Sequence, residues 1–515
     1  MDYLTVLNEE LSPELRKEFA RLEELFTVNT EMLKKITRRF GEELEQGLRE
    51  DRQNIPMNLT WVTSLPTGHE KGTFLTLDLG GTNLRVCLIT LDTPGQPDVV
   101  QQKYKLSEHL KTGSADELFD FMADSLQVFL EQHPHQTKQW DKESPLPLGF
   151  TFSYPATQER IDHGVLQTWT KGWDVKDVEG HDVAEMLRKA IQKRDLPIKL
   201  FALVNDTTGA LIASAYNDPE TIIGAIFGTG CNAAYMEKQK NIPKMARYPS
   251  AAGNSKTKSN TTGNPETDRG DNGAELMAIN CEYGAFDNSH SVLPRTRYDE
   301  LIDEESPRPG EQTFEKMSAG LYLGEIFRLV LVELRDRGVI FQKNGSPAGR
   351  ASRGEVNGSK VPTQGLDDAY ALDTEFLSLV ENDESPNLIE SCNVFEAHLH
   401  HADLPTIPIS PSREELLFFR RIAQLIAIRG ARLCACGVSA ICQRLGVDKG
   451  HVAADGSVAI KHPHFKTRWE KAVAEILDIE YGRIALTSAE DGSGIGAAVI
   501  AALTLKSDGS NNLQQ

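Results

Sequence analysis

Apolar residues in the first part of the chain recur at the spacing of a helix. Between residues 9 and 50, mixed charges surround apolar positions that lie three or four residues apart. Examples are Leu11, Leu15, Phe19, Leu22 and Leu25. Because residues at this spacing share one face of a helix, the pattern predicts a helical start to the chain.

Two later pairs of apolar runs predict hairpins. The runs TFLTLDL (73–79) and LRVCLITL (84–91) flank Gly80-Gly81-Thr82-Asn83, and TIIGAIF (221–227) and CNAAYM (231–236) flank Gly228-Thr229-Gly230. Strand-like runs on both sides of a glycine-rich turn are typical of β-hairpins. The two hairpins lie roughly 150 residues apart, which is the usual size of a domain. They therefore suggest a duplicated lobe.

The C-terminal part alternates between helix and strand patterns. Residues 412–445 are long, apolar and compatible with a helix, and Ser412 and Glu415 have the spacing of a capping box at its start. Residues 451–460, HVAADGSVAI, predict a further hairpin. Residues 483–505 predict a strand, a glycine turn and a closing helix.

Two stretches have the composition of flexible insertions. Residues 250–273 and 343–365 are rich in Gly, Ser, Asn and Thr and contain almost no large apolar residues. Such segments cannot bury enough apolar surface to offset the entropy of ordering.

Composition narrows the class of protein. A chain of 515 residues is long enough for two or more lobes. It carries 55 Lys and Arg against 75 Asp and Glu, a net charge of −20, with no basic run, which argues against a nucleic-acid or anionic-membrane partner. Seven cysteines without zinc-finger spacing predict reduced thiols, and no signal-peptide or membrane-spanning pattern is found. We expect a cytoplasmic protein.

A carboxylate follows one of the apolar strands. Phe201 to Val204 lead directly into Asn205, Asp206 and a helix-like run. The common role for Asp206 is that of a helix cap. The alternative is a general base, since ligands of α/β proteins bind at the ends of strands.

The glycine turns are candidates for phosphate binding. Glycines let backbone N–H groups approach an anion, and the turn Gly80 to Asn83 is bounded by Asp78 and Arg85. A plain hairpin turn is the alternative. Gly228 to Gly230 repeat the pattern, and residues 492–496 form a third glycine-rich turn.

Several other classes are excluded. Too few residues follow Gly492 for a dinucleotide-binding βαβ unit, no P-loop sequence occurs, and the protein-kinase motifs are absent. His398, His400, His401 and Asp403 lie close together, but we interpret this polar segment as a solvated loop rather than a metal site.

Several long stretches together resemble the hexokinase family, in particular the fungal glucokinases and hexokinases. They are LGFTFSYPATQERIDHGVLQTWTKGWDV (148–175), LDLGGTNLRV (77–86), LVNDTTGAL (203–211), FGTGCNAAYME (227–237) and INCEYGAFD (279–287). The resemblance implies the actin-like, ribonuclease H-like duplicated α/β fold, with a sugar cleft between two lobes. The small lobe would span residues 72–205 with a C-terminal helix near 491–508. The large lobe would hold residues 1–71 and 206–490.

The resemblance also implies a reaction and its residues. The enzyme would transfer a phosphoryl group from ATP, with Mg²⁺, to the 6-hydroxyl of glucose, the entry step of glycolysis. Asp206 would be the catalytic base and Lys171 would assist at the transferred group. The implied sugar-binding residues are Ser153, Thr170, Lys171, Asn205, Asp206, Asn232, Glu282 and Glu315. The implied nucleotide-binding residues are Asp78, which would also hold the metal, Gly80, Gly81, Thr82, Asn83, Arg85, Gly228, Thr229, Gly437 and Ser439.

Three alternatives stay open on the same fold. They are a broad-specificity hexokinase that also takes fructose and mannose, an N-acetylglucosamine kinase, and a sugar-sensing regulatory protein. Asp206 and Lys171 are both present, which argues against a protein that has lost catalysis. A monomer and a homodimer are equally compatible with the sequence.

Overall fold

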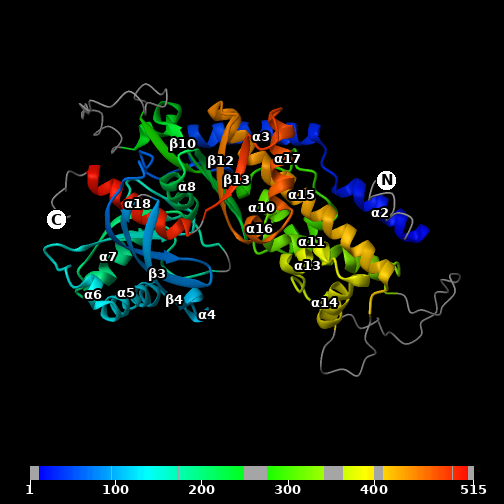
Figure 1. The fold of residues 1–515 in the computed structure, drawn as a ribbon, viewed down its shortest axis with the longest axis horizontal. Coiled ribbons are helices and arrows are strands. Elements are labelled where there is room, and N and C mark those ends of the chain that lie inside the picture. Colours follow the sequence, from blue (N-terminus) through cyan, green and yellow to red (C-terminus); the bar gives the residue numbers. More distant parts are fainter. Residues whose placement is uncertain are drawn as a thin grey trace.

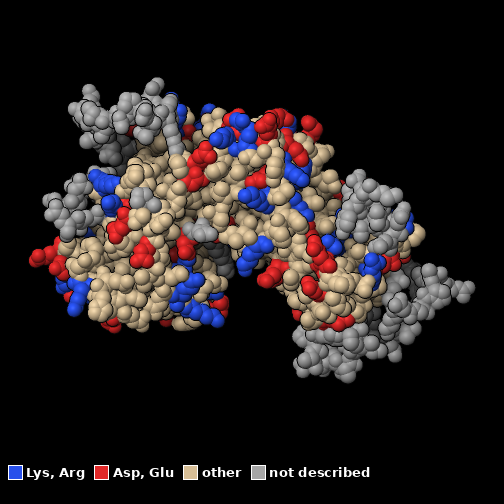
Figure 2. Space-filling model, viewed as in Figure 1, with Lys and Arg blue, Asp and Glu red and all other residues tan. Residues whose placement is uncertain are grey.

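The computed structural model describes residues 11–93, 95–170, 173–248, 275–341, 364–399, 410–489 and 491–507. Its elements form two lobes, and the space-filling view shows a hollow between them (Figures 1 and 2). The predicted insertion at 250–273 lies outside the described residues. So does nearly all of 343–365, of which the last two residues belong to a short helix.

The small lobe is built on a five-stranded sheet with the strand order β4-β3-β2-β5-β8. Three strands form an antiparallel meander, and β5 and β8 continue the sheet in parallel with β2. The strands are β2 (Gly72–Leu79), β3 (Asn83–Thr93), β4 (Gln96–Lys105), β5 (Leu146–Phe152) and β8 (Ile198–Val204). The hairpin predicted around the first glycine turn is therefore confirmed.

The large lobe holds a six-stranded sheet with the order β1-β11-β10-β9-β12-β13. Its strands are β1 (Asn58–Leu59), β9 (Thr221–Phe227), β10 (Cys231–Lys238), β11 (Leu276–Asn280), β12 (Gly450–Asp455) and β13 (Ile484–Ser488). β9 and β10 are the second predicted hairpin. Without β1, this sheet repeats the small-lobe plan, because an antiparallel meander is followed by two strands parallel to its first strand. The repeat confirms the duplicated α/β architecture.

Two helices lie between the sheets and bring the lobes together. α8 (Asp206–Asn217) packs on β9 and β10, and α18 (Gly492–Ser507) packs on β2, β5 and β8. The helices approach closely, since a Cβ atom on Gly496 would lie 2.2 Å from the carbonyl oxygen of Gly209. Their first turns therefore meet at the ends of the strands, between the two sheets.

The remaining helices lie outside this layer, and many of those in the large lobe pack on one another rather than on the sheet (Figure 1). In the small lobe these are α4 (Glu108–Thr112), α5 (Ala115–Gln132), α6 (Pro134–Thr137) and α7 (Val183–Lys193), beside a short ladder of β6 (Ala156–Thr157) and β7 (Val165–Leu166). In the large lobe they are α2 (Pro13–Phe26), α3 (Thr30–Arg49), α9 (Arg297–Glu305), α10 (Thr313–Ser318), α11 (Gly320–Asp336), α12 (Gln364–Asp367), α13 (Thr374–Asn382), α14 (Ile389–Leu399), α15 (Arg413–Leu445), α16 (Ser457–Lys461) and α17 (Phe465–Leu477). Short 3₁₀ turns are η1 (Gln239–Asn241), η2 (Pro243–Arg247), η5 (Tyr283–Ala285) and η6 (Pro386–Leu388).

The predicted helices are found, with local differences. The N-terminal pattern forms two helices, α2 and α3, and Leu25 stays exposed while the other four apolar examples are buried. The capping box at Ser412 and Glu415 is present at the start of α15. α15 is long and apolar enough to cross a membrane, but 83% of its most apolar window is buried inside the protein, as in a core helix.

The hairpin predicted at 451–460 is wrong. β12 ends at Asp455, Gly456 has a φ of +112°, and Ser457 begins α16. Val452 to Ala454 are buried in a parallel strand between β9 and β13. A strand that has neighbours on both sides leaves no edge for a hairpin partner, so the chain leaves the sheet as a helix.

Candidate active site

Asp206 lies at the first position of α8 and is not its cap. The N-cap is Asn205, whose Oδ1 accepts a hydrogen bond from Thr207 N over 2.9 Å. The Asp206 Oδ1 atom accepts from the same N–H over 2.7 Å and from the Thr207 hydroxyl over 3.2 Å. The positive end of the helix dipole and these donors hold a carboxylate at the point where the lobes meet.

Glu282 follows β11 in a left-handed conformation, with φ 55° and ψ 49°. Its Oε1 accepts hydrogen bonds from Asn280 Nδ2 over 2.9 Å and from Asn205 Nδ2 over 3.4 Å. The second of these bonds joins Glu282 to the residue that precedes Asp206. Two of the predicted sugar-binding residues are thus brought together.

Asn232 on β10 organises the backbone around these groups. Its Oδ1 accepts from Glu282 N over 2.8 Å, and its Nδ2 donates to Thr207 Oγ1 over 3.0 Å and to Asn280 Oδ1 over 2.7 Å. Thr207 is the residue that also donates to Asp206. One buried amide therefore links the positions of the Glu282 and Asp206 carboxylates.

Glu315 on α10 reaches the turn between β9 and β10. Its Oε2 accepts from Cys231 N over 3.1 Å. A Cβ atom on Gly230 would lie 2.6 Å from the same oxygen, so only glycine leaves room for the carboxylate there. The last glycine of the second predicted phosphate turn thus also sets the position of Glu315, one of the predicted sugar-binding residues.

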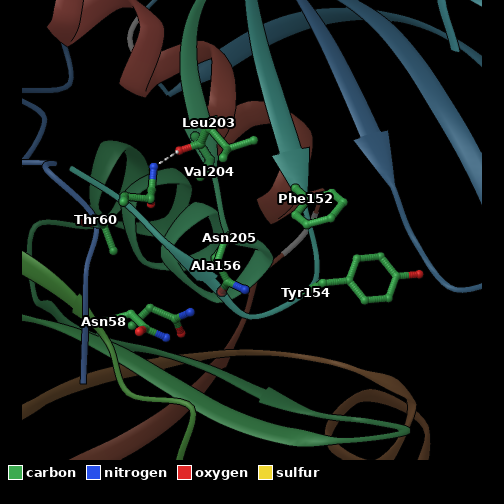
Figure 3. A pocket seen from close by; sticks show the side chains of 10 residues that line it. Asn58, Thr60, Phe152, Tyr154, Ala156, Leu203, Val204 and Asn205 are labelled. Carbon is green, nitrogen blue, oxygen red and sulfur yellow. Dashed lines mark hydrogen bonds between the residues drawn. The ribbon is translucent and has the colours of Figure 1, made fainter. Parts of the chain in front are cut away.

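A small cavity lies beside these residues, between the ends of β5 and β8 and strand β1. Figure 3 shows Asn58 and Asn205 together with the aromatic rings of Phe152 and Tyr154 at its wall. Asn280 also lines it. Polar amides therefore gather where the two lobes meet.

The first glycine turn is held from behind by aromatic residues. Trp173 Nε1 donates to the carbonyl oxygen of Gly81 over 3.1 Å, and the Trp173 ring stacks on Trp169 with centroids 5.3 Å apart. Thr170 lies between these tryptophans, and Ser153 directly follows β5. Lys171 lies outside the described residues.

Asp78 and Arg85 form an ion pair across the β2–β3 hairpin. Arg85 Nη2 lies 2.6 Å from Asp78 Oδ2, and Ser493 Oγ on α18 donates to that oxygen over 2.8 Å. Burial alone would lower the pKa of Arg85, but attraction to Asp78 outweighs it and raises the pKa. The pair ties the first glycine turn to the N-terminus of α18.

The second glycine turn packs against residues that the sequence did not single out. Gly228 O accepts from Gly320 N over 2.7 Å, and a Cβ atom on Gly456 would lie 2.7 Å from Gly228 N. Asp455, next to Gly456, has a raised pKa because it is buried and because Asp206 and Asp78 add negative charge. Residues 455–457, at the end of β12, thus belong to the site. The sequence signal that could have identified them is Asp-Gly-Ser directly after an apolar run.

Gly437 and Ser439 are not at the cleft. Both lie within α15, where Ser439 is fully buried and a Cβ on Gly437 would meet the rings of Tyr283 and Phe40 at 3.0 and 3.2 Å. Their burial within α15 does not support the expectation that these two residues flank adenosine, and the small size of Gly437 instead leaves room for the rings of Tyr283 and Phe40.

The described residues hold no group of three His, Cys, Asp or Glu that could bind a metal ion. His398 is on α14 rather than in a loop, and its Nδ1 lies 2.9 Å from the carbonyl oxygen of Val394. His400, His401 and Asp403 lie outside the described residues.

Two family models described as hexokinase match residues 18–216 and 222–503. The chain belongs to the hexokinase family. It is similar to a hexokinase of Emericella nidulans, with 49% identity over 96% of this chain and 91% of the relative. It is also similar to hexokinase-2 of Saccharomyces cerevisiae, with 44% identity over 96% and 93%.

Solved hexokinases share the fold. A Schistosoma mansoni hexokinase complexed with glucose matches with a TM-score of 0.76 and 32% identity, over 95% of this chain and 99% of that chain. A second hexokinase matches with a TM-score of 0.72 and 29% identity, over 96% and 100%. This hexokinase is therefore an ATP-dependent hexose kinase with the two-lobed, actin-like fold.

Proposed function

We propose that this hexokinase phosphorylates the 6-hydroxyl of glucose, with Asp206 as the general base. The observation that carries the proposal is the hydrogen-bonded set that joins Asn205, Asp206, Asn232 and Glu282 between the lobes. The Schistosoma hexokinase of the same fold was solved with glucose, which supports glucose as the sugar.

The sugar end of the site is rich in acceptors and amides. Glu282 and Glu315 would accept hydrogen bonds from sugar hydroxyls, and Asn205 and Thr170 would donate. Asn232, whose two amide hydrogens are already donated to Thr207 and Asn280, would hold these groups in place. Ser153 and Lys171 would complete the set. Each buried hydroxyl needs a partner, so this set favours a pyranose whose hydroxyls are all free. Asp206 would take the proton of the 6-hydroxyl as its oxygen attacks the γ-phosphorus.

The phosphate end is formed by the two glycine turns. Backbone N–H groups of Gly80 to Asn83 would face the phosphates from the small lobe, and Thr229 would face them from the large lobe. Arg85 and Lys171 would add positive charge near the transferred group, where positioning and charge neutralisation supply most of the acceleration.

The carboxylate of Asp78 suits a Mg²⁺ ion that arrives with the nucleotide. In proteins, Mg²⁺ is commonly bound by one or two carboxylates together with substrate phosphates. Here Asp78 is buried, and it lies close enough to Asp455 for its negative charge to raise the pKa of Asp455. Asp78 would hold the ion, through water. When bound, Mg²⁺ neutralises negative charge on the phosphate oxygens.

The adenosine end lies beyond the second glycine turn. Gly456 and Ser457 replace Gly437 and Ser439 in this role, because their backbone packs directly on Gly228. Leu321, at the start of α11, and Ile460, on α16, are exposed large apolar side chains on elements that adjoin this turn. They would provide apolar contact for the adenine ring.

The reaction would take place in the cytoplasm. All seven cysteines are free and six are buried, and burial raises the pKa of Cys434 to about 12. Inert thiols of this kind are typical of a reducing compartment. The assembly would be a monomer or a homodimer.

The experiment that tests the sugar is a comparison of kcat/KM for glucose, mannose, fructose and N-acetylglucosamine at one ATP and Mg²⁺ concentration. We expect glucose first and mannose next. Fructose should be poorer, because its furanose form does not present its hydroxyls to both glutamates in the same geometry, and the acetamide of N-acetylglucosamine should crowd the donors at the 2-position.

The alternative functions predict other rankings of the four sugars by kcat/KM. Fructose equal to glucose would favour a broad-specificity hexokinase. Efficient phosphorylation of N-acetylglucosamine would replace the glucose proposal. No turnover with any of the four sugars would leave the sugar-sensing protein.

A further inference from the structure

A row of charged side chains crosses the small-lobe sheet from the first phosphate turn to the sheet edge. On β2 and β3, Asp78 lies opposite Arg85, and on β3 and β4, Arg85 lies opposite Lys103. Two residues along, Asn83 of the turn lies opposite Lys105. Because residues directly opposite each other in antiparallel strands point to the same face, both lysines share the face of Arg85 and Asn83.

The two lysines carry unbalanced positive charge. Lys103 and Lys105 are exposed, and neither forms an ion pair with any residue for which the structure gives a position. By contrast, Arg85 is paired with Asp78 and Asp491, and Lys111 on nearby α4 is paired with Glu108. Figure 2 shows Lys and Arg gathered over β4 and α4, beside the hollow between the lobes.

The position of Lys103 and Lys105 is important because the molecule as a whole is negatively charged. The chain carries a net charge of −20, so its average field repels a polyanion such as ATP. A local positive edge beside a hollow concentrates anions there and counteracts that repulsion. Unpaired lysines act over a distance comparable with the Debye length, about 10 Å at 0.1 M salt, and so need not touch the ligand.

We propose that Lys103 and Lys105 on β4 form a capture surface for the triphosphate of ATP, outside the glycine turns that bind it. The ligand class is a linear polyphosphate, recognised by charge rather than by shape. The inference rests on the proposed function, because it takes the turn at Gly80 to Asn83 as the phosphate site.

The test is the double charge reversal Lys103→Glu/Lys105→Glu. Its matched control is Lys138→Glu/Lys189→Glu, which makes the same change at exposed, unpaired lysines of the small lobe. Lys189 is on α7, which packs on β8 at the opposite edge of the sheet. A second control, Lys103→Arg/Lys105→Arg, keeps the charge.

Two measurements are made on each variant, in about 0.02 M and about 0.5 M NaCl, where screening lengths differ about fivefold. The first is kcat/KM for ATP at saturating glucose. The second is the Kd for inorganic tripolyphosphate by calorimetry, which does not depend on turnover. At low salt we expect the reversal to lower kcat/KM for ATP by about tenfold, through a higher KM rather than a lower kcat. The Kd for tripolyphosphate should rise by about tenfold.

At high salt the difference from the parent should shrink to less than about twofold, because the charges are screened. The arginine variant should match the parent in both salts. The proposal would be overturned if Lys103→Glu/Lys105→Glu and the control Lys138→Glu/Lys189→Glu changed kcat/KM and Kd equally. A loss of the same size in both salts would also overturn it. An inactive parent enzyme would instead contradict the proposed function, and the tripolyphosphate measurement still tests the capture surface.

Discussion

Asn280 donates a hydrogen bond from Nδ2 to Glu282 Oε1 over 2.9 Å, and Glu282 itself has left-handed backbone angles. Such a conformation costs a residue other than glycine on the order of 1–3 kcal/mol and persists only when its surroundings enforce it. Asn280 holds the side chain of Glu282, and Asn232 holds its backbone N–H. Two amides thus fix the direction of the carboxylate that we propose binds the sugar.

The first prediction concerns Asn280. A lost hydrogen bond to a charged group costs about 1.5–3 kcal/mol, so Asn280→Ala should lower kcat/KM for glucose about 10–100-fold. The loss should appear mainly in KM for the sugar, while KM for ATP changes little. Steady-state kinetics with each substrate varied in turn measures this.

A double-mutant cycle with Glu282→Gln separates positioning from general damage. If Asn280 acts through Glu282, the two losses are not additive. Fully additive losses, or a similar rise of KM for both substrates, would show that Asn280 supports only the fold.

The second prediction concerns Asp206. Because Asn205 is the N-cap of α8, Asp206→Ala should leave the melting temperature almost unchanged and lower kcat by about 10²–10⁴-fold, the range for a lost general base. The matched control is Asp182→Ala, since Asp182 caps α7 and accepts from Ala184 N over 3.0 Å. That control should lose about 1 kcal/mol of stability and keep its kcat. Near-normal turnover of the Asp206 variant would contradict its role as base.

The third prediction concerns pH and the buried Glu381 on α13. Burial alone would raise its pKa, but the close contact with His462, whose Nε2 lies 3.0 Å from Oε2, and the hydrogen bonds from Arg468 outweigh burial and lower the pKa from 4.5 to about 2. A carboxyl with a depressed folded-state pKa stabilises the protein above about pH 5, and this contribution is lost as the pH falls toward 2. A shift of this size corresponds to about 3 kcal/mol at neutral pH.

Glu381→Gln should therefore lower the free energy of unfolding at pH 7 by about 3 kcal/mol, and it also removes the charge that faces Arg468. The gap between the variant and the parent should narrow as the pH falls from 5 toward 3. Denaturant titrations at several pH values measure this. Glu375→Gln on the exposed face of the same helix is the control and should show no such gap. A gap that does not depend on pH would point to lost packing instead.

Several parts of this molecule were predictable from local patterns. Both glycine hairpins stand where strand-like runs flank Gly-Thr turns, and the capping box at Ser412 marks the start of α15. The strand, turn and helix at the C-terminus are likewise found as β13 and α18. These signals are local, because a turn or a cap depends on residues that are near one another in sequence.

Other features depend on tertiary contacts that a sequence pattern does not contain. The small residues of α15 resemble a ligand site, yet Gly437 serves to admit the ring of Tyr283. Residues 451–460 alternate as a hairpin would, but β9 and β13 occupy both sides of β12. Nothing near Glu282 in sequence indicates its left-handed backbone, since Asn232, which fixes its N–H, lies 50 residues away.

The fourth prediction concerns Gly230 and Glu315. A Cβ atom at position 230 would lie 2.6 Å from Glu315 Oε2 and 3.4 Å from its Cδ, so Gly230→Ala must displace the carboxylate. It should raise KM for glucose about tenfold or more, since a misplaced acceptor leaves a buried sugar hydroxyl unpaired. Gly41→Ala is the control, because nothing lies within 4 Å of its Cβ position in α3 and alanine favours a helix by up to about 1 kcal/mol.

The same substitution in a Glu315→Ala background decides the cause. Without the glutamate there is no carboxylate to displace, so Gly230→Ala should then add little further loss in kcat/KM for glucose. Gly230 also ends the second phosphate turn, where Gly228 N donates to Gly230 O over 3.0 Å. An equal further loss in both backgrounds, together with a raised KM for ATP, would therefore mean that the alanine distorts the turn itself and that Gly230 serves the nucleotide rather than the sugar.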